Sequence, residues 1–168
     1  MLRNEKMKFS FCPDCGSKLL EKECGDEGLV PFCPQCSKPL FSFSYPCVIC
    51  LVTDENKQIA LIKQSYVSDR YICVAGYVKQ GETIENTAKR EVEEETGLKV
   101  KSVKYIKSYY YQKCDNLMFG FVCHVNHSDF ILSDEVESAK WFSINEAQEL
   151  LRPGSIGKDL LKDYLSGV

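Results

Sequence analysis

Residues 76–98 read GYVKQGETIENTAKREVEEETGL, and this segment determines how the rest of the chain is interpreted. Its second half predicts a helix that begins after Thr83, whose hydroxyl can accept a hydrogen bond from a free amide of the first turn. Gly97 follows the last helical residues, where a left-handed position favours a residue without a Cβ. Three apolar residues at helical spacing should pack this helix onto a sheet: Ile84, Ala88 and Val92.

Three carboxylates of this helix share one face, since they are related as i, i+3 and i+4: Glu91, Glu94 and Glu95. Like charges so close together repel one another unless a cation lies between them. Ligands made only of oxygen suit Mg²⁺ or Mn²⁺, and Mg²⁺ commonly completes its coordination with substrate phosphates. The alternative is a solvated acidic face, which is the usual arrangement of a charge run. Glu93 should point to the opposite face, into water.

The residues around these glutamates match a known motif at fixed spacing. The motif is G-x5-E-x7-R-E-U-x-E-E-x-G-U, where U is a bulky aliphatic residue. Its positions are filled by Gly76, Glu82, Arg90, Glu91, Val92, Glu94, Glu95, Gly97 and Leu98. The sequence therefore resembles the Nudix hydrolases. This resemblance implies an α/β fold, an α/β/α sandwich with a mixed sheet, and hydrolysis of a nucleoside diphosphate linked to another moiety.

The resemblance also implies roles for individual residues. Arg90 and Glu82 would hold the carboxylates in place by ion pairing. Glu91 is the first candidate for the base that takes a proton from water, and Glu135, from a later loop, is the second. The catalytic Mg²⁺ or Mn²⁺ would be held by Glu91, Glu94, Glu95 and the backbone carbonyl of Gly76.

Residues 1–42 contain two Cys-x-x-Cys pairs separated by seventeen residues. Each pair places two thiolates on one tight turn, and two such turns supply the four sulfurs of a closed structural Zn²⁺ site: Cys12, Cys15, Cys33 and Cys36. The segment resembles a zinc ribbon, and the metal should supply its folding energy because it has little apolar sequence. A redox dithiol or a disulfide is the alternative. The Nudix domain should then occupy residues 43–168.

Composition excludes several classes of protein. The 168 residues are 44% hydrophobic and 27% charged, with a formal net charge of −3, which is ordinary for a globular domain with a small appendage. This acidic balance argues against a general nucleic-acid or membrane-surface binder. The sequence shows no signal peptide and no apolar run of about 20 residues, so we expect a cytoplasmic protein with reduced cysteines.

Outside the helix, short apolar runs predict strands and periodic apolar residues predict helices. The strands are expected at residues 47–53, 59–63, 72–75, 100–111, 117–125 and 137–142, and the further helices at 145–151 and 155–165. The first two strands should form a hairpin. His124 and His127 flank the end of one strand and should be structural or solvated, as lone histidines usually are there.

A zinc ribbon before a Nudix domain resembles the NADH pyrophosphatase group of that family. This implies cleavage of NADH or NAD to nicotinamide mononucleotide and AMP. Residues 75–78, 134–142 and 153–156 resemble further segments of the group. The group's marker Ser-Gln-Pro-Trp-Pro-Phe-Pro-x-Ser is missing, because Ser108 is followed by YYYQKC. ADP-ribose or another capped nucleoside diphosphate is therefore the alternative substrate.

Three tyrosines are candidates for binding that substrate. Tyr77 lies where the group has Phe. Tyr109 and Tyr111 should share one face of a strand, with Tyr110 on the other. They either stack on a base or are ordinary strand aromatics.

A different class of function is a nucleotide sensor or nucleic-acid-binding regulator. The complete set of glutamates in the motif favours an enzyme over such a regulator, and nucleic acid is not an expected partner. A homodimer is expected by analogy with the family.

Overall fold

The computed structural model describes residues 9–64 and 68–167. The chain divides into two compact units, Met1–Ser44 and Tyr45–Val168. Each unit is described by itself. No helix in the described residues is long and apolar enough to cross a membrane.

The first unit contains a three-stranded antiparallel sheet with the strand order β1-β2-β3. Its strands are β1 (Leu20–Glu23), β2 (Leu29–Cys33) and β3 (Lys38–Pro39), and a short 3-10 helix, η1 (Gly25–Glu27), joins the first two. The buried cluster is small and consists of Cys12, Leu19 and Cys33, with Phe9, Cys36 and Leu40 packed against it. Cysteines thus make up much of the interior of this unit.

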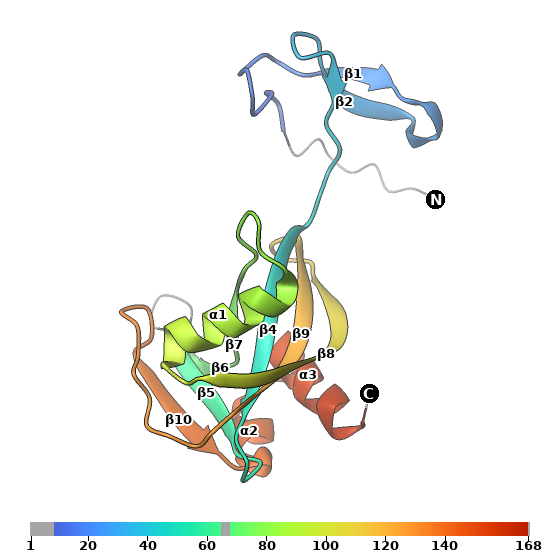
Figure 1. The fold of residues 1–168 in the computed structure, drawn as a ribbon. Helices are drawn as coiled ribbons and strands as arrows, with labels where there is room; N and C mark the ends of the chain where they lie inside the picture. The colour runs from blue at the N-terminus through green and yellow to red at the C-terminus, as the bar shows by residue number, and fades with distance from the viewer. Residues whose placement is uncertain (1–8, 65–67, 168) are drawn as a thin grey trace. The chain divides into compact units, whose positions relative to one another are not determined.

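The second unit is built on a seven-stranded mixed sheet (Figure 1). The strand order is β10-β5-β4-β9-β8, and β6 and β7 pair with β5 and β4. The neighbours β4 and β9 are parallel, and the other pairs are antiparallel. The strands are β4 (Tyr45–Thr53), β5 (Ile59–Gln64), β6 (Ser68–Ile72), β7 (Val74–Tyr77), β8 (Val100–Tyr111), β9 (Asn116–Val125) and β10 (Ser138–Phe142).

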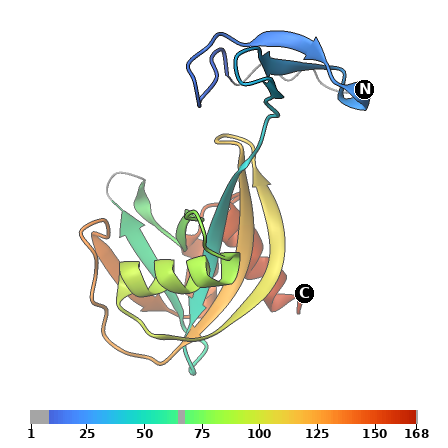
Figure 2. The ribbon, with the colours of Figure 1, turned by 45° about the horizontal axis from the view of Figure 1, so that its top comes forward.

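Helices cover both faces of this sheet, as the views in Figures 1 and 2 show. Helix α1 (Ile84–Thr96) lies on one face, and α2 (Ile144–Leu150) and α3 (Ile156–Leu165) lie on the other. Two apolar clusters fill the two interfaces. One joins Ala88 and Val92 of α1 to the sheet, and the other joins Leu160 and Leu161 of α3 to it. The predicted α/β/α sandwich with a mixed sheet is confirmed.

Helix α1 begins and ends where the sequence predicts. The Thr83 hydroxyl accepts a hydrogen bond from the Asn86 amide at 3.3 Å. Gly97 adopts a left-handed conformation with a φ of 73°. Ala88 and Val92 are fully buried, and Ile84 packs against the same cluster. The predicted packing of α1 on the sheet is confirmed.

The predicted hairpin forms, because Val52 and Thr53 of β4 pair with Ala60 and Ile59 of β5. The strand predicted at residues 72–75 is wrong in its extent. There β6 ends at Ile72 and β7 begins at Val74, since β6 pairs with β5 whereas β7 pairs with β4. The chain therefore changes its partner strand within the segment that the sequence presents as one apolar run.

Candidate active site

Glu95 is the most deeply buried glutamate of the predicted site, with 5% of its surface exposed. Its Oε1 accepts a hydrogen bond from the Gln64 side chain at 2.8 Å, and Gln64 lies at the end of β5. Its Oε2 is buried and has no hydrogen-bond partner in the described part of the chain. Burial, followed by the negative charge of Glu91, raises the pKa of Glu95 to about 8.

Glu91 lies one helical turn earlier and fills the space that Gly76 leaves open. A Cβ placed on Gly76 would lie 2.0 Å from Glu91 Cδ, so any side chain at this position of β7 would displace the carboxylate. Burial raises the pKa of Glu91, against the opposing effect of the Arg90 guanidinium. The glycine of the motif therefore makes room for a carboxylate in this structure.

Arg90 connects the carboxylates of the site. Its Nε and Nη2 donate to the two oxygens of Glu82 at 2.7 and 2.9 Å, which is a bidentate pair. Its Nη1 donates to Glu91 at 2.6 Å and to Glu94 at 2.9 Å. The hydrogen bond from Arg90 is the main reason why the pKa of Glu82 falls to about 2. One guanidinium therefore orients three of the glutamates.

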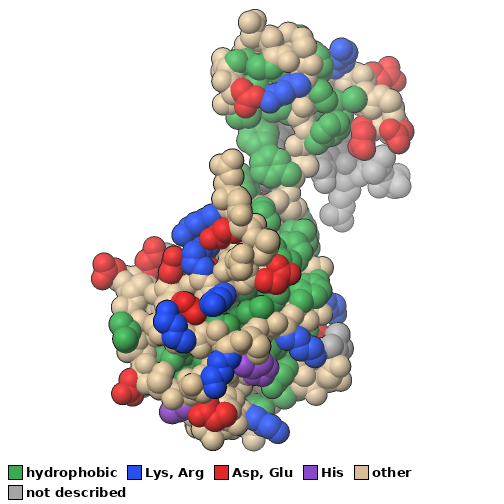
Figure 3. Space-filling model, viewed as in Figure 1, with side chains coloured by type: hydrophobic (Ala, Val, Ile, Leu, Met, Phe, Trp, Pro, Cys, Tyr) green, Lys and Arg blue, Asp and Glu red, His purple; other side chains and the backbone are tan. Residues whose placement is uncertain are grey.

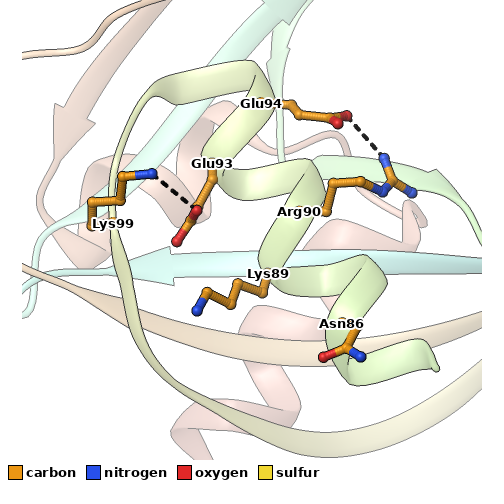
Figure 4. Close-up of a pocket in the computed structure, with 6 residues that line it drawn as sticks. All are labelled: Asn86, Lys89, Arg90, Glu93, Glu94 and Lys99. Atoms are coloured by element: carbon orange, nitrogen blue, oxygen red, sulfur yellow. Dashed lines mark hydrogen bonds and ion pairs between the residues drawn. The ribbon is translucent and has the colours of Figure 1, made fainter. Parts of the chain in front are cut away.

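Glu93 and Glu94 lie on the outer side of α1, where Figure 4 shows Arg90 reaching Glu94 and Lys99 reaching Glu93. The Glu94 side chain is 52% exposed. Glu93 is only 22% exposed, and it also accepts a hydrogen bond from the Val100 amide at 3.2 Å. The prediction that Glu93 points freely into water is wrong, because this carboxylate fastens the end of α1 to the start of β8.

The glutamates fit a hard divalent cation by their chemistry. A buried carboxylate oxygen without a hydrogen-bond partner is costly, and Glu95 Oε2 has no such partner among the described residues. Carboxylate oxygens are the ligands that Mg²⁺ and Mn²⁺ prefer. Among the described residues, however, only the four N-terminal cysteines place three or more potential ligand atoms within 4.8 Å of one another. The glutamates would thus have to adjust their side chains around an ion.

Glu135, the second candidate base, lies in the loop before β10. After burial and the charge of Glu91, the negative charge of Glu135 also contributes to the raised pKa of Glu95, so the two carboxylates repel each other. The structure thus brings this loop residue toward the glutamates of α1.

The four predicted zinc ligands come together in the first unit: Cys12, Cys15, Cys33 and Cys36. The Sγ atoms of Cys15 and Cys33 are 3.5 Å apart, which is well beyond a disulfide bond. Hydrogen bonds from Ser17 lower the pKa of the Cys15 thiol to about 6, and a thiolate is the form that binds metal. Four sulfurs at this spacing fit a tetrahedral Zn²⁺ site.

The three tyrosines lie on one face of the sheet, the face that carries α3. Tyr77 pairs with Cys47, and Tyr109 pairs with Met118, and both partners belong to the buried cluster of that face. Tyr109 packs in this cluster, and its hydroxyl donates to Asp163 of α3 at 2.8 Å. The Tyr77 ring, in contrast, is exposed and meets Tyr45 edge to face at 6.3 Å.

A hollow of about 540 Å³ opens on this same face, and we call it the cationic pocket. Its floor is formed by buried apolar side chains, among them Ile49 and Met118. Tyr111 lines it, and the other notable lining side chains are three exposed cations: Arg70, Lys113 and Arg152. Among the residues that the structure describes, those that line the pocket include no Asp or Glu.

The cationic pocket and the glutamates lie on opposite sides of β7. Ala75 lines the pocket, and Gly76, the next residue, contacts Glu91. Sequence reasoning missed the three cations and also Gln64, which orients Glu95. No local pattern marks these residues, since each comes from a different element and only the fold brings them to the site.

The comparisons with known proteins agree with this geometry. Residues 44–163 match the family described as NUDIX domain. The chain is 32% identical over 157 residues to the NAD-capped RNA hydrolase NudC of Pseudomonas aeruginosa, covering 93% of this chain and 55% of that protein. It is 29% identical over 158 residues to the protein of the same name from Photobacterium profundum, covering 94% and 58%. The chain thus spans little more than half the length of these relatives.

Solved structures share the fold. A NUDIX hydrolase from Nitrosomonas europaea superposes with a TM-score of 0.71 at 22% identity, covering 94% of this chain and 91% of that one. The NUDIX domain of Shewanella oneidensis NrtR, solved with ADP ribose, superposes with a TM-score of 0.66 at 11% identity, covering 81% and 93%. At these identities the likeness shows the fold alone. The motif, the fold and the match over residues 44–163 together show that this chain belongs to the Nudix family.

Proposed function

We propose that this protein hydrolyses the diphosphate bond of a nucleoside diphosphate derivative, with NADH or NAD as the first substrate class. The observation that carries the proposal is the buried Glu95 carboxylate, which lies beside Glu91 within the complete motif and has one oxygen without a partner among the described residues. The names of the similar NudC proteins support an NAD-containing substrate. ADP-ribose is the alternative small substrate.

The metal role follows from the donor set. Mg²⁺ or Mn²⁺ would be held by carboxylate oxygens and by the backbone carbonyl of Gly76. When bound, such an ion neutralises charge on the diphosphate oxygens and lowers the pKa of a water molecule. Before binding, Arg90 holds Glu91 and Glu94 in position through Nη1. The Gln64 side chain holds Glu95 in position by donating to Oε1 of Glu95. This leaves Oε2 of Glu95 available among the described residues.

Glu91 is our first choice for the general base. Its side chain is mostly buried beside Gly76, and burial raises its pKa, which makes the carboxylate a better proton acceptor than an exposed one. A water oxygen would form a bond to one phosphorus while the bond from that phosphorus to the bridging oxygen breaks. The proton of the water would pass to Glu91. Glu135 is the second choice.

The nucleoside end of the substrate would enter the cationic pocket, which lies across β7 from the glutamates. Tyr111 lines this pocket, and the exposed ring of Tyr77 lies on the same face. We leave Tyr109 out of the subsite, because its ring packs in the core and its hydroxyl is bound to Asp163. The four cysteines would bind a structural Zn²⁺ with no open coordination position.

The test is a hydrolysis panel with Mg²⁺ or Mn²⁺, in which NADH, NAD⁺, ADP-ribose, FAD and UDP-sugars are compared by chromatography of the products. We expect AMP and nicotinamide mononucleotide from NADH or NAD⁺. The Glu95→Gln variant should lose roughly 100-fold or more in turnover, because it loses a metal-binding carboxylate.

The Glu85→Gln variant is the matched control, since Glu85 lies in the exposed first turn of the same helix and outside the site. Equal activity of Glu95→Gln and wild type would contradict the assignment of the site. Tight nucleotide binding without any hydrolysis would instead favour a nucleotide sensor.

A further inference from the structure

Gln64 is a polar residue at a position of β5 where the pattern of the strand favours an apolar one. Ala60 and Ile62 belong to the buried cluster on the face of the sheet that carries α1. Gln64 is the next residue of this row, because the side chains of a strand alternate between the two faces. It is 6% exposed. A buried amide is costly unless it is hydrogen-bonded, so this position requires a specific partner for Gln64.

That partner is Glu95 of α1. The Gln64 Nε2 donates to Glu95 Oε1 at 2.8 Å, and both side chains are buried. The ionised carboxylate, which is the form that binds a metal, only accepts hydrogen bonds, so the nitrogen end of the amide must face it. Oε2 of Glu95 is buried and has no partner among the described residues. The amide therefore fixes one oxygen of this carboxylate and, through it, the direction of the other.

Glu95 differs from the other glutamates of the motif in the kind of donor that holds it. The Arg90 guanidinium, a cation, donates to three of them: Glu82, Glu91 and Glu94. Basic and acidic side chains are also intermixed on the exposed surface over α1 (Figure 3). Within the described part of the chain, Glu95 accepts a hydrogen bond only from the neutral amide of Gln64. Its charge is therefore not offset by a cation of the protein, and a divalent ion would offset it.

We propose that Gln64 is a positioning residue for the divalent cation, which holds Glu95 so that Oε2 is presented to the ion. This inference rests on the proposed function, because it assigns the ion to the glutamates of α1. Gln64 itself would contact neither the ion nor the substrate. Without its hydrogen bond the Glu95 side chain could turn about its own torsions, and binding of the ion would first have to order it. Hydrogen bonds that orient a metal ligand in this way contribute strongly to metal affinity.

The experiment measures the affinity of the full chain for Mn²⁺ without substrate, by electron paramagnetic resonance of the free ion. Gln64→Met removes the donor and keeps the length of the side chain. Gln64→Asn keeps a buried amide but is one methylene too short to reach Glu95. The matched control is Gln58→Met, the same substitution just before the other end of β5, where Gln58 uses its backbone amide to contact Asp54. Circular dichroism verifies that each variant is folded.

We expect both Gln64 variants to bind Mn²⁺ about tenfold more weakly than wild type, because an oriented ligand has been lost. The control should bind Mn²⁺ like wild type. Turnover of the diphosphate substrate should fall in the Gln64 variants at low Mn²⁺ and return toward the wild-type value at high Mn²⁺. A residue with only a structural role in the core would not produce a loss that excess Mn²⁺ restores.

Unchanged Mn²⁺ affinity in a folded Gln64 variant, or a loss of turnover that excess Mn²⁺ does not restore, would overturn the inference. Where Gln64→Met does not fold, Gln64→Asn decides by the same criteria. Unchanged affinity in the Gln64 variants of an enzyme that hydrolyses NADH overturns this inference alone. A Gln64-dependent Mn²⁺ affinity in a protein that hydrolyses none of the diphosphates overturns the proposed function alone.

Discussion

At the residue scale, Asp54 shows how one buried carboxylate joins two distant loops. Its side chain is 0% exposed, and Oδ1 accepts hydrogen bonds from the amides of Asn56 and Gln58 at 2.9 and 2.7 Å. Oδ2 lies 2.7 Å from His127 Nδ1, and the His127 ring stacks on Trp141. His127 therefore has a structural role, one of the two that the sequence leaves open, as the partner that holds the loop after β9 against the turn between β4 and β5.

These contacts predict how stability depends on pH. Burial raises the pKa of Asp54, whereas the hydrogen bonds from Gln58, His127 and Asn56 lower it. The hydrogen bonds outweigh burial, so the pKa lies below its ordinary value of 3.8. Ionised Asp54 therefore stabilises the folded state above this value, and the contribution disappears as the pH falls through the lower folded pKa. Asp54→Asn should reduce the free energy of unfolding by about 1–3 kcal/mol at pH 7, measured by urea denaturation. The difference from wild type should shrink below pH about 4, and a constant difference from pH 7 to pH 3 would contradict this account.

Gly76 gives a second prediction at this scale. Gly76→Ala should reduce kcat by about 10- to 100-fold, because the new Cβ would lie 2.0 Å from Glu91 Cδ and displace the proposed base. The fold should remain, since the Glu91 carboxylate is the end of a flexible side chain and can move. Steady-state kinetics and a thermal melt check both parts. Full activity in this variant would show that the position of Glu91 beside Gly76 is unimportant.

At the scale of elements, the end of helix α1 depends on a glycine for two reasons. Gly97 has a φ of 73°, and a Cβ there would lie 2.7 Å from the Ile131 Cβ. The Ile131 amide also donates to the Thr96 carbonyl at 2.9 Å, so the loop after β9 runs directly against the helix end. The sequence predicts the left-handed turn, but it does not predict the loop that presses on it.

Gly97→Ala should therefore destabilise the protein by more than about 1 kcal/mol, because backbone strain and crowding act together. The control is Gly154→Ala, since Gly154 also has a φ of 73° but its added Cβ would meet nothing within 4 Å. Chemical denaturation measures the loss of unfolding free energy in each variant, and the difference between the two losses is the contribution of crowding at Gly97. Equal losses of stability would show that backbone strain accounts for the whole effect.

The strands show which features of the sheet can be predicted from the sequence and which cannot. The antiparallel pair β8 and β9 lies where alternating and apolar residues predict two strands, because each run is long and is bounded by a polar turn. The sequence predicts one strand from Ile72 to Ala75, but this run is divided between β6 and β7. Apolar character indicates burial, but it does not indicate the partner strand.

At the scale of the whole molecule, the two units should depend on different sources of stability. The first unit has a buried cluster of only a few residues, which include Cys12 and Cys33, whereas the second has two large apolar clusters. If the cysteines bind Zn²⁺, the metal supplies most of the folding free energy of the first unit.

Metal analysis of the purified protein should therefore find about one Zn²⁺ per chain. Removal of the zinc with a chelator, or the Cys33→Ser substitution, should abolish amide protection in residues 9–44 and leave that of the second unit intact, as measured by hydrogen exchange. Cys24→Ser is the control, since Cys24 is a free thiol outside the cluster. Retained protection in residues 9–44 without zinc would contradict a structural role for the metal.

The sequence by itself determined the features that depend on local spacing. The glutamates of α1, the caps of that helix and the four cysteines all follow from fixed intervals along the chain, because a helix or a tight turn converts such intervals directly into geometry. Only the tertiary structure decided which other residues join them. Gln64 reaches Glu95 across 31 positions of sequence, Tyr109 is held by Asp163, and three cations meet around one hollow. These contacts depend on strand order and on the packing of α3, and neither is encoded in any local pattern.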